Sequence, residues 1–171
     1  MRACSARVFR LGVLVLAAAL AGCNYGLLGG GFPSHIRTVF IEPFENRTDR
    51  FELDQALAQQ LVEKLPRSLG LRLAGAEVAD AVIRGRVMQY TDQARNYEPG
   101  SQGNINVLQH QVRITVAVEM IDRTRNEIVW ESQGVTGIGE YRPDTQAPDA
   151  AQAVALESVV QQIVDGAQSN W

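Results

Sequence analysis

Few side chains in this sequence are spaced for acid–base or nucleophilic chemistry. The two histidines, His35 and His110, form no metal-binding spacing such as a pair four residues apart on a helix. Ser132 lacks the preceding glycine that places a nucleophilic serine on a sharp turn. Asp49 and Glu52, three residues apart, fit the capping of a helix better than a catalytic pair. We therefore expect no enzyme activity, no metal and no cofactor, and we expect both histidines to lie at the surface.

Three arginines have residue types and spacing suited to binding an anion instead. Arg84 and Arg86 are two residues apart in a segment that we predict to be a strand, so their side chains would share one face. Arg113 has the matching parity if the next predicted strand pairs in register. Guanidinium groups make bidentate, charge-assisted bonds with phosphate. Two alternatives stay open: these arginines meet acidic residues of a partner protein, or they face only water, as most exposed charges do.

The N-terminal residues predict export and lipid attachment. Three arginines lie within the first ten residues, and the apolar run Leu11–Ala21 follows them. This run of 11 residues is shorter than the roughly 20 residues of a membrane-spanning helix, so it fits the apolar part of a secretory signal. It ends in Leu20-Ala21-Gly22-Cys23, which resembles the lipobox of bacterial lipoproteins. That resemblance implies cleavage before Cys23 and attachment of acyl chains to its sulfur.

Removal of residues 1–22 sets the size and charge of the mature protein. It leaves residues 23–171, enough for one domain with its own core, and it removes Cys4, the only cysteine other than Cys23. Three arginines and no acidic residue are lost, so the net charge changes from −3 to −6. Because a mildly acidic domain has no long-range attraction for nucleic acid, we expect no such partner. The glycine-rich residues 23–34 predict a flexible tether, and residues 35–171 a single domain.

The rest of the sequence predicts an α+β domain in the order β-α-β-β-β-α. Alternating or β-branched apolar residues indicate the strands, and apolar residues every three or four positions indicate the helices. The predicted strands are 38–41, 81–91, 111–121 and 128–135, and the predicted helices are 53–65 and 149–167. We expect Asp49 and Glu52 to cap the first helix. The polar residues 92–108 predict a long loop.

These elements predict a two-layer α/β sandwich, with a four-stranded mixed sheet and two helices on one face. The core between the two layers should include Leu57, Leu61, Ile83, Val87, Val112, Ile114, Val116, Val159 and Ile163. The open face of the sheet should carry Arg84, Arg86, Arg113, Thr115 and Glu119. Strict alternation along residues 81–91 would place Met88 and Tyr90 on the same side as the arginines.

With the elements in place, the sequence resembles the LptE family, the outer-membrane lipoproteins that assemble lipopolysaccharide together with the LptD β-barrel. The resemblance lies in residues 23–27 (CNYGL), 33–39 (PSHIRTV), 41–48 (IEPFENRT), 79–85 (ADAVIRG) and 170–171 (NW). It implies a four-stranded sheet covered by two helices, and a plug inside LptD that helps deliver lipopolysaccharide to the outer leaflet. The family's basic lipopolysaccharide-contacting residues lie where this sequence has no motif to align, so none is transferred.

The same resemblance implies a lipid-anchored protein at the periplasmic face of the outer membrane. Asn24 is not the aspartate that, in enterobacterial lipoproteins, resembles an inner-membrane retention signal. The alternative is a different periplasmic lipoprotein with a related small domain. An asparagine turn after the first strand and an Ala-Asp-x-x-x-x-Gly strand entry also occur in activators of peptidoglycan synthases and in secretion-pore lipoproteins. Such a protein would activate or scaffold another envelope machine and bind no glycolipid.

Overall fold

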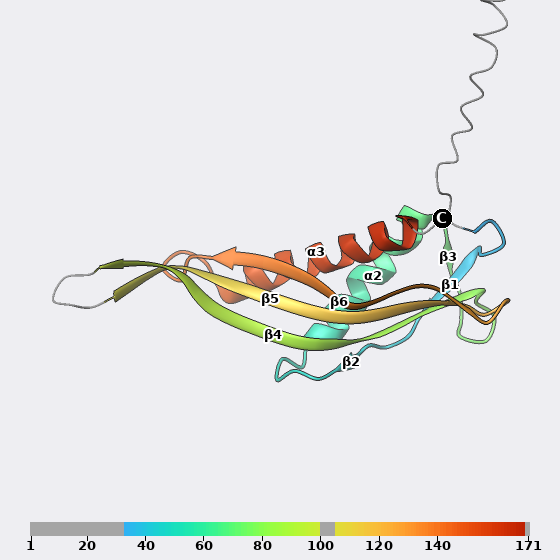
Figure 1. Cartoon of the computed structure of the whole chain (residues 1–171), viewed down its shortest axis with the longest axis horizontal. Helices are drawn as coiled ribbons and strands as arrows, with labels where there is room; N and C mark the ends of the chain where they lie inside the picture. Colours follow the sequence, from blue (N-terminus) through green and yellow to red (C-terminus); the bar gives the residue numbers. More distant parts are fainter. Residues whose placement is uncertain (1–32, 100–104, 170–171) are drawn as a thin grey trace, which may run out of the picture.

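The computed structural model describes residues 33–99 and 105–169, so Cys23 and the tether up to residue 32 lie outside the described residues. Figure 1 shows a long sheet with two helices along one side. The elements in chain order are β1 (Thr38–Ile41), β2 (Glu45–Asn46), α2 (Leu53–Leu69), β3 (Arg72–Leu73), β4 (Ala81–Pro99), β5 (Ile105–Asp122), β6 (Glu127–Tyr141) and α3 (Pro148–Ser169).

The strands form one six-stranded mixed sheet in the order β3-β1-β4-β5-β6, with β2 pairing farther along β4. β1 lies parallel to β3 and to β4, whereas β4, β5 and β6 form an antiparallel meander. The α+β class, with two helices and a mixed sheet, is confirmed. The predicted number of four strands is wrong, because the sheet also contains β2 and β3. Each of these two strands is only two residues long. Two residues are too few to show a period-two pattern.

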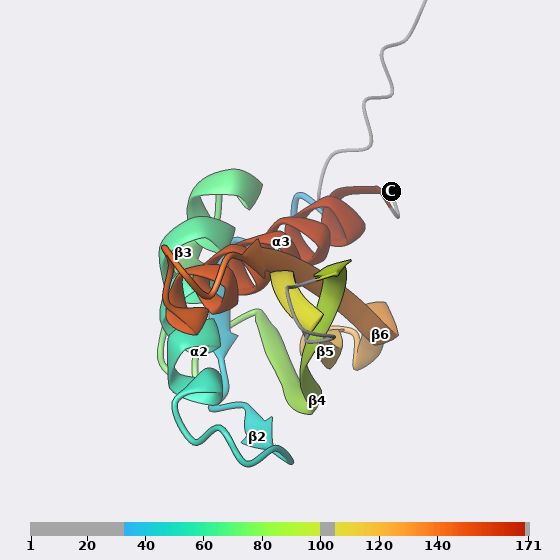
Figure 2. The same cartoon turned by 90° about the vertical axis from the view of Figure 1, so that its left-hand side faces the viewer.

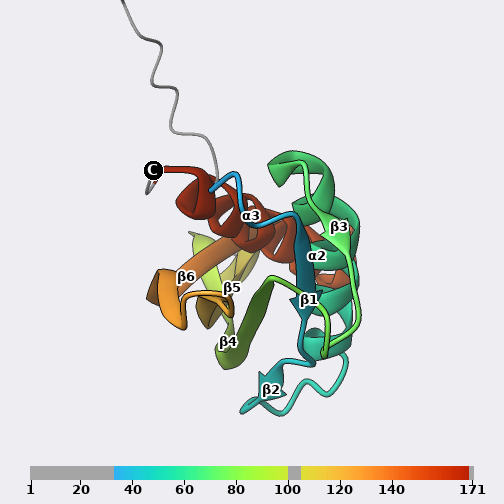
Figure 3. The same cartoon turned by 90° about the vertical axis from the view of Figure 1, so that its right-hand side faces the viewer.

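Both helices lie on one face of this sheet (Figure 2; Figure 3). One hydrophobic core joins them to that face. In α2 the leucines at 53, 57, 61 and 65 recur every four residues, and all four are fully buried. In α3 Val159, Val160 and Ile163 form the corresponding buried stripe. Each of the nine predicted core residues is at most 1% exposed, so the predicted core is confirmed.

Two glycines of β6 allow α3 to lie directly on the sheet. A Cβ atom at Gly137 would collide with the backbone carbonyl of Ala155, and one at Gly139 with the backbone carbonyl of Ala151. Ala151 and Ala155 are four residues apart and therefore lie on one side of the helix. Contact between a helix backbone and a strand backbone needs small residues on both partners, and these four residues supply them.

The loop before α2 is organised by Asn46 and not by the predicted cap. Glu52 occupies the N-cap position and makes no side-chain capping bond, so the predicted pairing of Asp49 with Glu52 is wrong. Instead, the side-chain oxygen of Asn46 accepts a hydrogen bond from the backbone N–H of Thr48, and its amide donates to the carbonyl of Arg50. Asparagine side chains stabilise turns in this way, which removes the need for a side-chain cap at this helix.

The predicted loop over residues 92–108 is also wrong, because both flanking strands continue into it. β4 runs to Pro99 and β5 begins at Ile105, and their pairing includes Ala94 with His110 and Asn96 with Gln109. The two ends form an arm that projects beyond the N-terminal end of α3 (Figure 1). This arm has no helix on either face to bury apolar side chains. Its sequence therefore lacks the apolar alternation from which strands are predicted.

A β-bulge at Met88 changes which side chains of β4 face the core. Val87 pairs with Val116 and Gln89 pairs with Thr115, so Met88 is an extra residue with no partner in β5. The extra residue reverses the alternation beyond it. Tyr90 consequently packs against the core, and the prediction that it shares the side of Arg84 and Arg86 is wrong.

Candidate functional site

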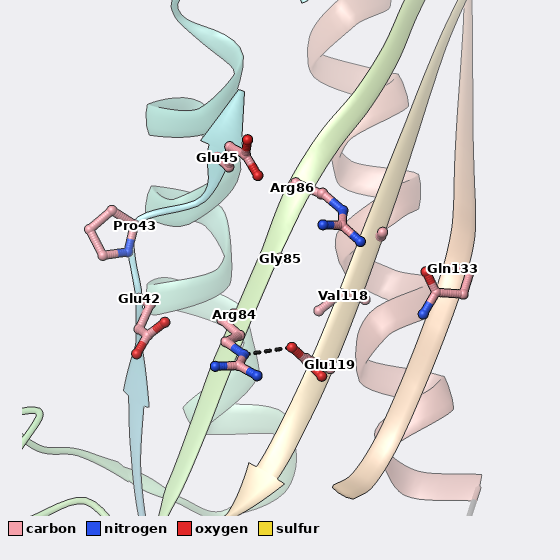
Figure 4. Close-up of a pocket in the computed structure, with 10 residues that line it drawn as sticks. Glu42, Pro43, Glu45, Arg84, Gly85, Arg86, Val118, Glu119 and Gln133 are labelled. Carbon is pink, nitrogen blue, oxygen red and sulfur yellow. Dashed lines mark hydrogen bonds and ion pairs between the residues drawn. The ribbon is translucent and has the colours of Figure 1, made fainter. Parts of the chain in front are cut away.

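Two of the three candidate arginines line one hollow on the open face of the sheet. Arg84 and Arg86 project from β4 on the side opposite the core (Figure 4). The hollow has a volume of about 460 Å³ and is bounded by the β1–β2 link, by β5 and by β6. The remaining polar side chains that line it are Glu42, Glu45, Glu119 and Gln133.

Arg84 already has a partner inside the hollow. Its Nε donates a 2.5 Å hydrogen bond to Oε1 of Glu119, the residue directly opposite it in β5. This bond, together with the negative charge of Glu119, raises the pKa of Arg84 above its usual value. The bond uses only Nε, so a phosphate that binds the terminal nitrogens of Arg84 would share the guanidinium charge with Glu119.

Arg86 is the arginine with an unused donor. Its Nε is buried and has no hydrogen-bond partner among the described residues. Glu45 lies opposite Arg86 in the pairing of β2 with β4, but the Glu45 carboxylate bonds to Arg47, with 3.2 Å from Arg47 Nε to Glu45 Oε1. A buried donor without a partner costs free energy, and a ligand oxygen would recover it only if the Arg86 side chain moved to expose Nε.

The net charge of the hollow is not positive, because three glutamates, 42, 45 and 119, accompany the two arginines. Its attraction for an anion therefore depends on directional bonds at short range and not on a long-range field. Within this hollow Arg84 is ion-paired to Glu119 through Nε, whereas Arg86 forms no ion pair among the described residues.

Arg113 lies on the same open face but outside this hollow. It pairs with Thr91 in β4 and with Ile138 in β6, and it donates a 3.3 Å hydrogen bond to the side-chain oxygen of Gln111. The partner of Arg86 in β5 is Ala117, four residues from Arg113 and thus roughly 13 Å away along the strand. The structure brings Arg84 and Arg86 together and leaves Arg113 apart.

The family model described as LptE, lipopolysaccharide-assembly, matches residues 36–166. The chain belongs to the LptE family. The match includes all three arginines and both helices up to residue 166, and it confirms the family resemblance seen in the sequence. The LptE family is a family of lipopolysaccharide-assembly lipoproteins of the cell envelope and not a family of enzymes.

The solved structures that are similar to this LptE-family chain are distant from it in sequence. The hypothetical protein CT253 from Chlamydia trachomatis has 12% identity and a TM-score of 0.55, covering 79% of this chain and 97% of its own. The PelC dodecamer from Paraburkholderia phytofirmans has 16% identity and a TM-score of 0.49, covering 79% and 92%. Lipoprotein GNA1162 from Neisseria meningitidis has 11% identity and a TM-score of 0.46, covering 75% and 99%. No curated protein matches the chain in sequence. The first likeness shows a shared fold alone.

His35 is partly exposed, with 31% of its side-chain surface accessible, and it contacts a buried carboxylate. Its Nε2 lies 2.5 Å from Oδ2 of Asp122, a residue that is only 2% exposed at the end of β5. Burial acts to raise the pKa of Asp122, but hydrogen bonds from His35, Thr124 and the backbone N–H of Arg125 outweigh it and lower the pKa to about 2. His35 and Asp122 are 87 residues apart in the sequence, so local sequence patterns give no signal of this contact.

Asp80 forms a second anchor for the start of the domain. Its carboxylate accepts hydrogen bonds from the Thr38 hydroxyl and from the backbone N–H groups of Arg37 and Thr38. The Thr38 hydroxyl, followed by the Arg37 backbone, lowers the pKa of Asp80. The carboxylates at 80 and 122 thus stabilise the point where the LptE-family domain begins.

His110, also predicted at the surface, belongs to a hydrogen-bonded group at the base of the arm. Its Nδ1 lies 2.8 Å from Asp92 Oδ1, and the Tyr141 hydroxyl donates a 2.8 Å bond to Asp92 Oδ2. Burial, then the bond to Asp92, raises the pKa of Tyr141 to about 12. At neutral pH that hydroxyl is protonated and serves as a fixed donor, which holds the three strands together where the arm leaves the sheet.

Two further findings concern metals and membranes. Within residues 33–99 and 105–169, no three histidine, cysteine, aspartate or glutamate side chains are grouped so that they could hold a metal ion. In that same part of the chain, neither helix combines the length and the apolar character needed to cross a membrane.

Proposed function

We propose that this protein is an outer-membrane lipoprotein that plugs an LptD-type β-barrel and assists lipopolysaccharide transport to the cell surface. The family match over residues 36–166 is the observation that carries this proposal. The lipobox-like sequence ending at Cys23 supports it, because it provides the means of anchoring the domain at the periplasmic face of the membrane. In this role the protein is a binding partner and catalyses no reaction.

The acyl chains and the tether have separate roles in placing the domain: the acyl chains provide membrane affinity and the tether provides reach. The acyl chains on Cys23 supply the membrane affinity. Residues 23–34, rich in glycine, can extend to about 40 Å at roughly 3.4 Å per residue. The domain can therefore enter a barrel from the periplasmic side while its lipid stays in the inner leaflet.

The open face of the sheet is the part of the domain that would contact lipopolysaccharide. A mature domain with a charge of −6 repels this polyanion at long range, so binding depends on arginines within a Debye length of roughly 8 Å. Arg86 offers the free donor, Arg84 can bind a phosphate through its terminal nitrogens, and Arg113 provides a separate contact along β5. Acidic residues of the barrel wall are the competing partners for the same arginines.

Purification of the mature protein from outer membranes tests this function. A tagged wild-type chain should co-purify with one large β-barrel, whereas Cys23→Ser should yield an uncleaved or soluble periplasmic protein. Stable fractionation of the wild type with the inner membrane would contradict the outer-membrane location. Co-purification with a peptidoglycan synthase or a secretion pore, and with no transport barrel, would replace this proposal with the alternative of an activator or scaffold.

A further inference from the structure

Four apolar side chains form one row across the open face, near the end where the domain begins. The strand register places Phe40 of β1 opposite Val82 of β4, Val82 opposite Ile121 of β5, and Ile121 opposite Ile128 of β6. Directly opposite residues of neighbouring strands point to the same side of a sheet. The row therefore crosses β1, β4, β5 and β6 as a continuous apolar strip.

This row does not belong to the hydrophobic core. Its members alternate with core residues such as Ile83 and Met120, and none of the four is part of the buried cluster that joins the helices to the sheet. Phe40, Val82 and Ile121 line a second hollow of about 330 Å³ on the open face, whose charged lining residues are Glu42, Glu77, Arg84 and Arg123. Val82 is 8% exposed and forms the floor, and Ile128 beside the hollow is 56% exposed. Apolar side chains that line an open hollow are suited to contact an apolar ligand.

The second hollow adjoins the arginine hollow. Glu42 and Arg84 line both of them, so charged side chains separate an apolar floor from the free donor of Arg86. Strands lie about 4.8 Å apart, and the row from β1 to β6 is thus roughly 14 Å long. This length and its chemistry fit an extended fatty acyl chain beside an anionic headgroup.

We propose that the row of Phe40, Val82, Ile121 and Ile128 is an acyl-chain subsite. Its ligand is the same phosphorylated glycolipid whose headgroup lies at Arg86, so this inference rests on the proposed function. The headgroup bonds to the Arg86 guanidinium, and one acyl chain lies across the strands on the apolar floor. The row then orients the glycolipid with its chains toward the end of the domain from which the tether leaves.

Photolabelling of the full mature lipoprotein in phospholipid vesicles tests the orientation. Two probes are needed, both bisphosphorylated, acylated glucosamine disaccharides: one carries a diazirine on an acyl chain and the other carries it on the sugar. The acyl probe should label peptides that contain Phe40, Val82, Ile121 or Ile128. The sugar probe should label β4 or β5 beside Arg86.

A pair of matched variants measures the contribution of the row. Val82→Thr with Ile121→Thr keeps β-branched side chains in the strands but makes the floor polar, and it should lower acyl labelling at least about fivefold. Sugar labelling should change less than about twofold, since Arg86 is retained. The control, Val62→Thr with Val154→Thr, also replaces two β-branched apolar side chains with threonine, at exposed positions on the two helices, and should alter neither signal. Thermal melting of each variant identifies any loss of folding.

The outcomes separate this inference from the proposed function. Sugar labelling beside Arg86 with acyl labelling on the helices or on the arm would overturn the subsite and leave glycolipid binding intact. Acyl labelling that is unchanged in a folded Val82/Ile121 variant would overturn it as well. Specific labelling by neither probe would contradict glycolipid binding itself. Loss of barrel co-purification in that variant, with both labels intact, would assign the row to the barrel interface instead.

Discussion

The two faces of this sheet differ sharply although the same strands form both. On the helix-covered face, Val87, Val112, Ile114 and Val116 are fully buried, and glycines bring α3 into backbone contact with β6. On the open face, the same strands present an ion pair, an arginine with an unused donor and a partly exposed apolar row. The comparison indicates that stability resides on the covered face, and we propose that recognition resides on the open face. Substitutions on the two faces should therefore have separable effects.

The largest loss of stability should come from the centre of the covered face. Gly137→Ala places a Cβ against the backbone of Ala155, so α3 must move off the sheet. We expect the free energy of unfolding to fall by about 3 kcal/mol, measured by urea denaturation. Gly134→Ala is the matched control on the same strand, since a Cβ there meets no atom within 4 Å and should change stability by less than about 0.5 kcal/mol. Equal losses in both variants would contradict the close helix–strand contact.

A somewhat smaller loss should follow at the end of the covered face where the domain begins. Asp122→Asn removes a buried charge that is stabilised by His35 and by backbone N–H groups, and it should lower stability at neutral pH by about 2 kcal/mol. Asp144→Asn, at an exposed loop position, should leave stability nearly unchanged.

The lowered pKa of Asp122 predicts how the stability of the protein depends on pH. This pKa is lowered from the usual 3.8 to about 2, so the folded protein binds fewer protons than the unfolded chain in this interval. The contribution of Asp122 to stability is complete above pH 4 and is lost as the pH falls through about 2. In urea titrations from pH 5 to pH 2, wild type should lose its advantage over Asp122→Asn. A constant difference across that range would contradict the lowered pKa.

A loss of about 1 kcal/mol is expected at the opposite end of the covered face. Tyr141→Phe removes the hydroxyl that donates to Asp92 at the base of the arm. Tyr90→Phe is the control, because the Tyr90 hydroxyl makes no hydrogen bond to Asp92 and its removal should cost less than about 0.5 kcal/mol. Urea denaturation compares the two, and faster amide exchange in the arm should accompany Tyr141→Phe only. The reverse order of stability would show that the Asp92 group does not hold the arm.

The sequence predicts most of the covered face because burial imposes a period. The apolar residues of α2, α3 and the middle of β5 recur at helical or strand spacing, and all nine predicted core positions are buried. The sequence does not predict the bulge at Met88, because an inserted residue has no characteristic composition. The bulge reverses the side of the sheet on which Tyr90 lies. The sequence does not predict the strands of the arm for a related reason: a ribbon without a buried face has no apolar alternation.

The open face could be predicted only in part. The alternation of side chains along each strand predicts that Arg84, Arg86, Arg113 and Glu119 lie on one side of the sheet. The observed strand pairing agrees with this prediction. Which of these side chains lie together depends on how far each strand is shifted against its neighbour, and this separates Arg113 from the other two arginines. The contacts of His35 and His110 join segments distant in sequence, so only the fold reveals them.

The smallest effect on stability, and the decisive effect on binding, should come from the open face. Replacing Arg84, Arg86 and Arg113 with glutamine should shift the melting temperature by no more than about 2 °C, since these side chains lie outside the core. A control with glutamine at Arg67, Arg125 and Arg142 carries the same change in net charge at exposed positions away from the open face. Comparison of the two variants separates local contacts from overall electrostatics.

Lipopolysaccharide binding by the purified mature protein is the measurement that tests this division of the two faces most directly. The open-face variant should bind about tenfold more weakly than wild type, because charge-assisted bonds to phosphate are lost, while the control variant changes little. Unchanged binding in the folded open-face variant, or an equal loss in the control, would contradict recognition of the glycolipid by the open face.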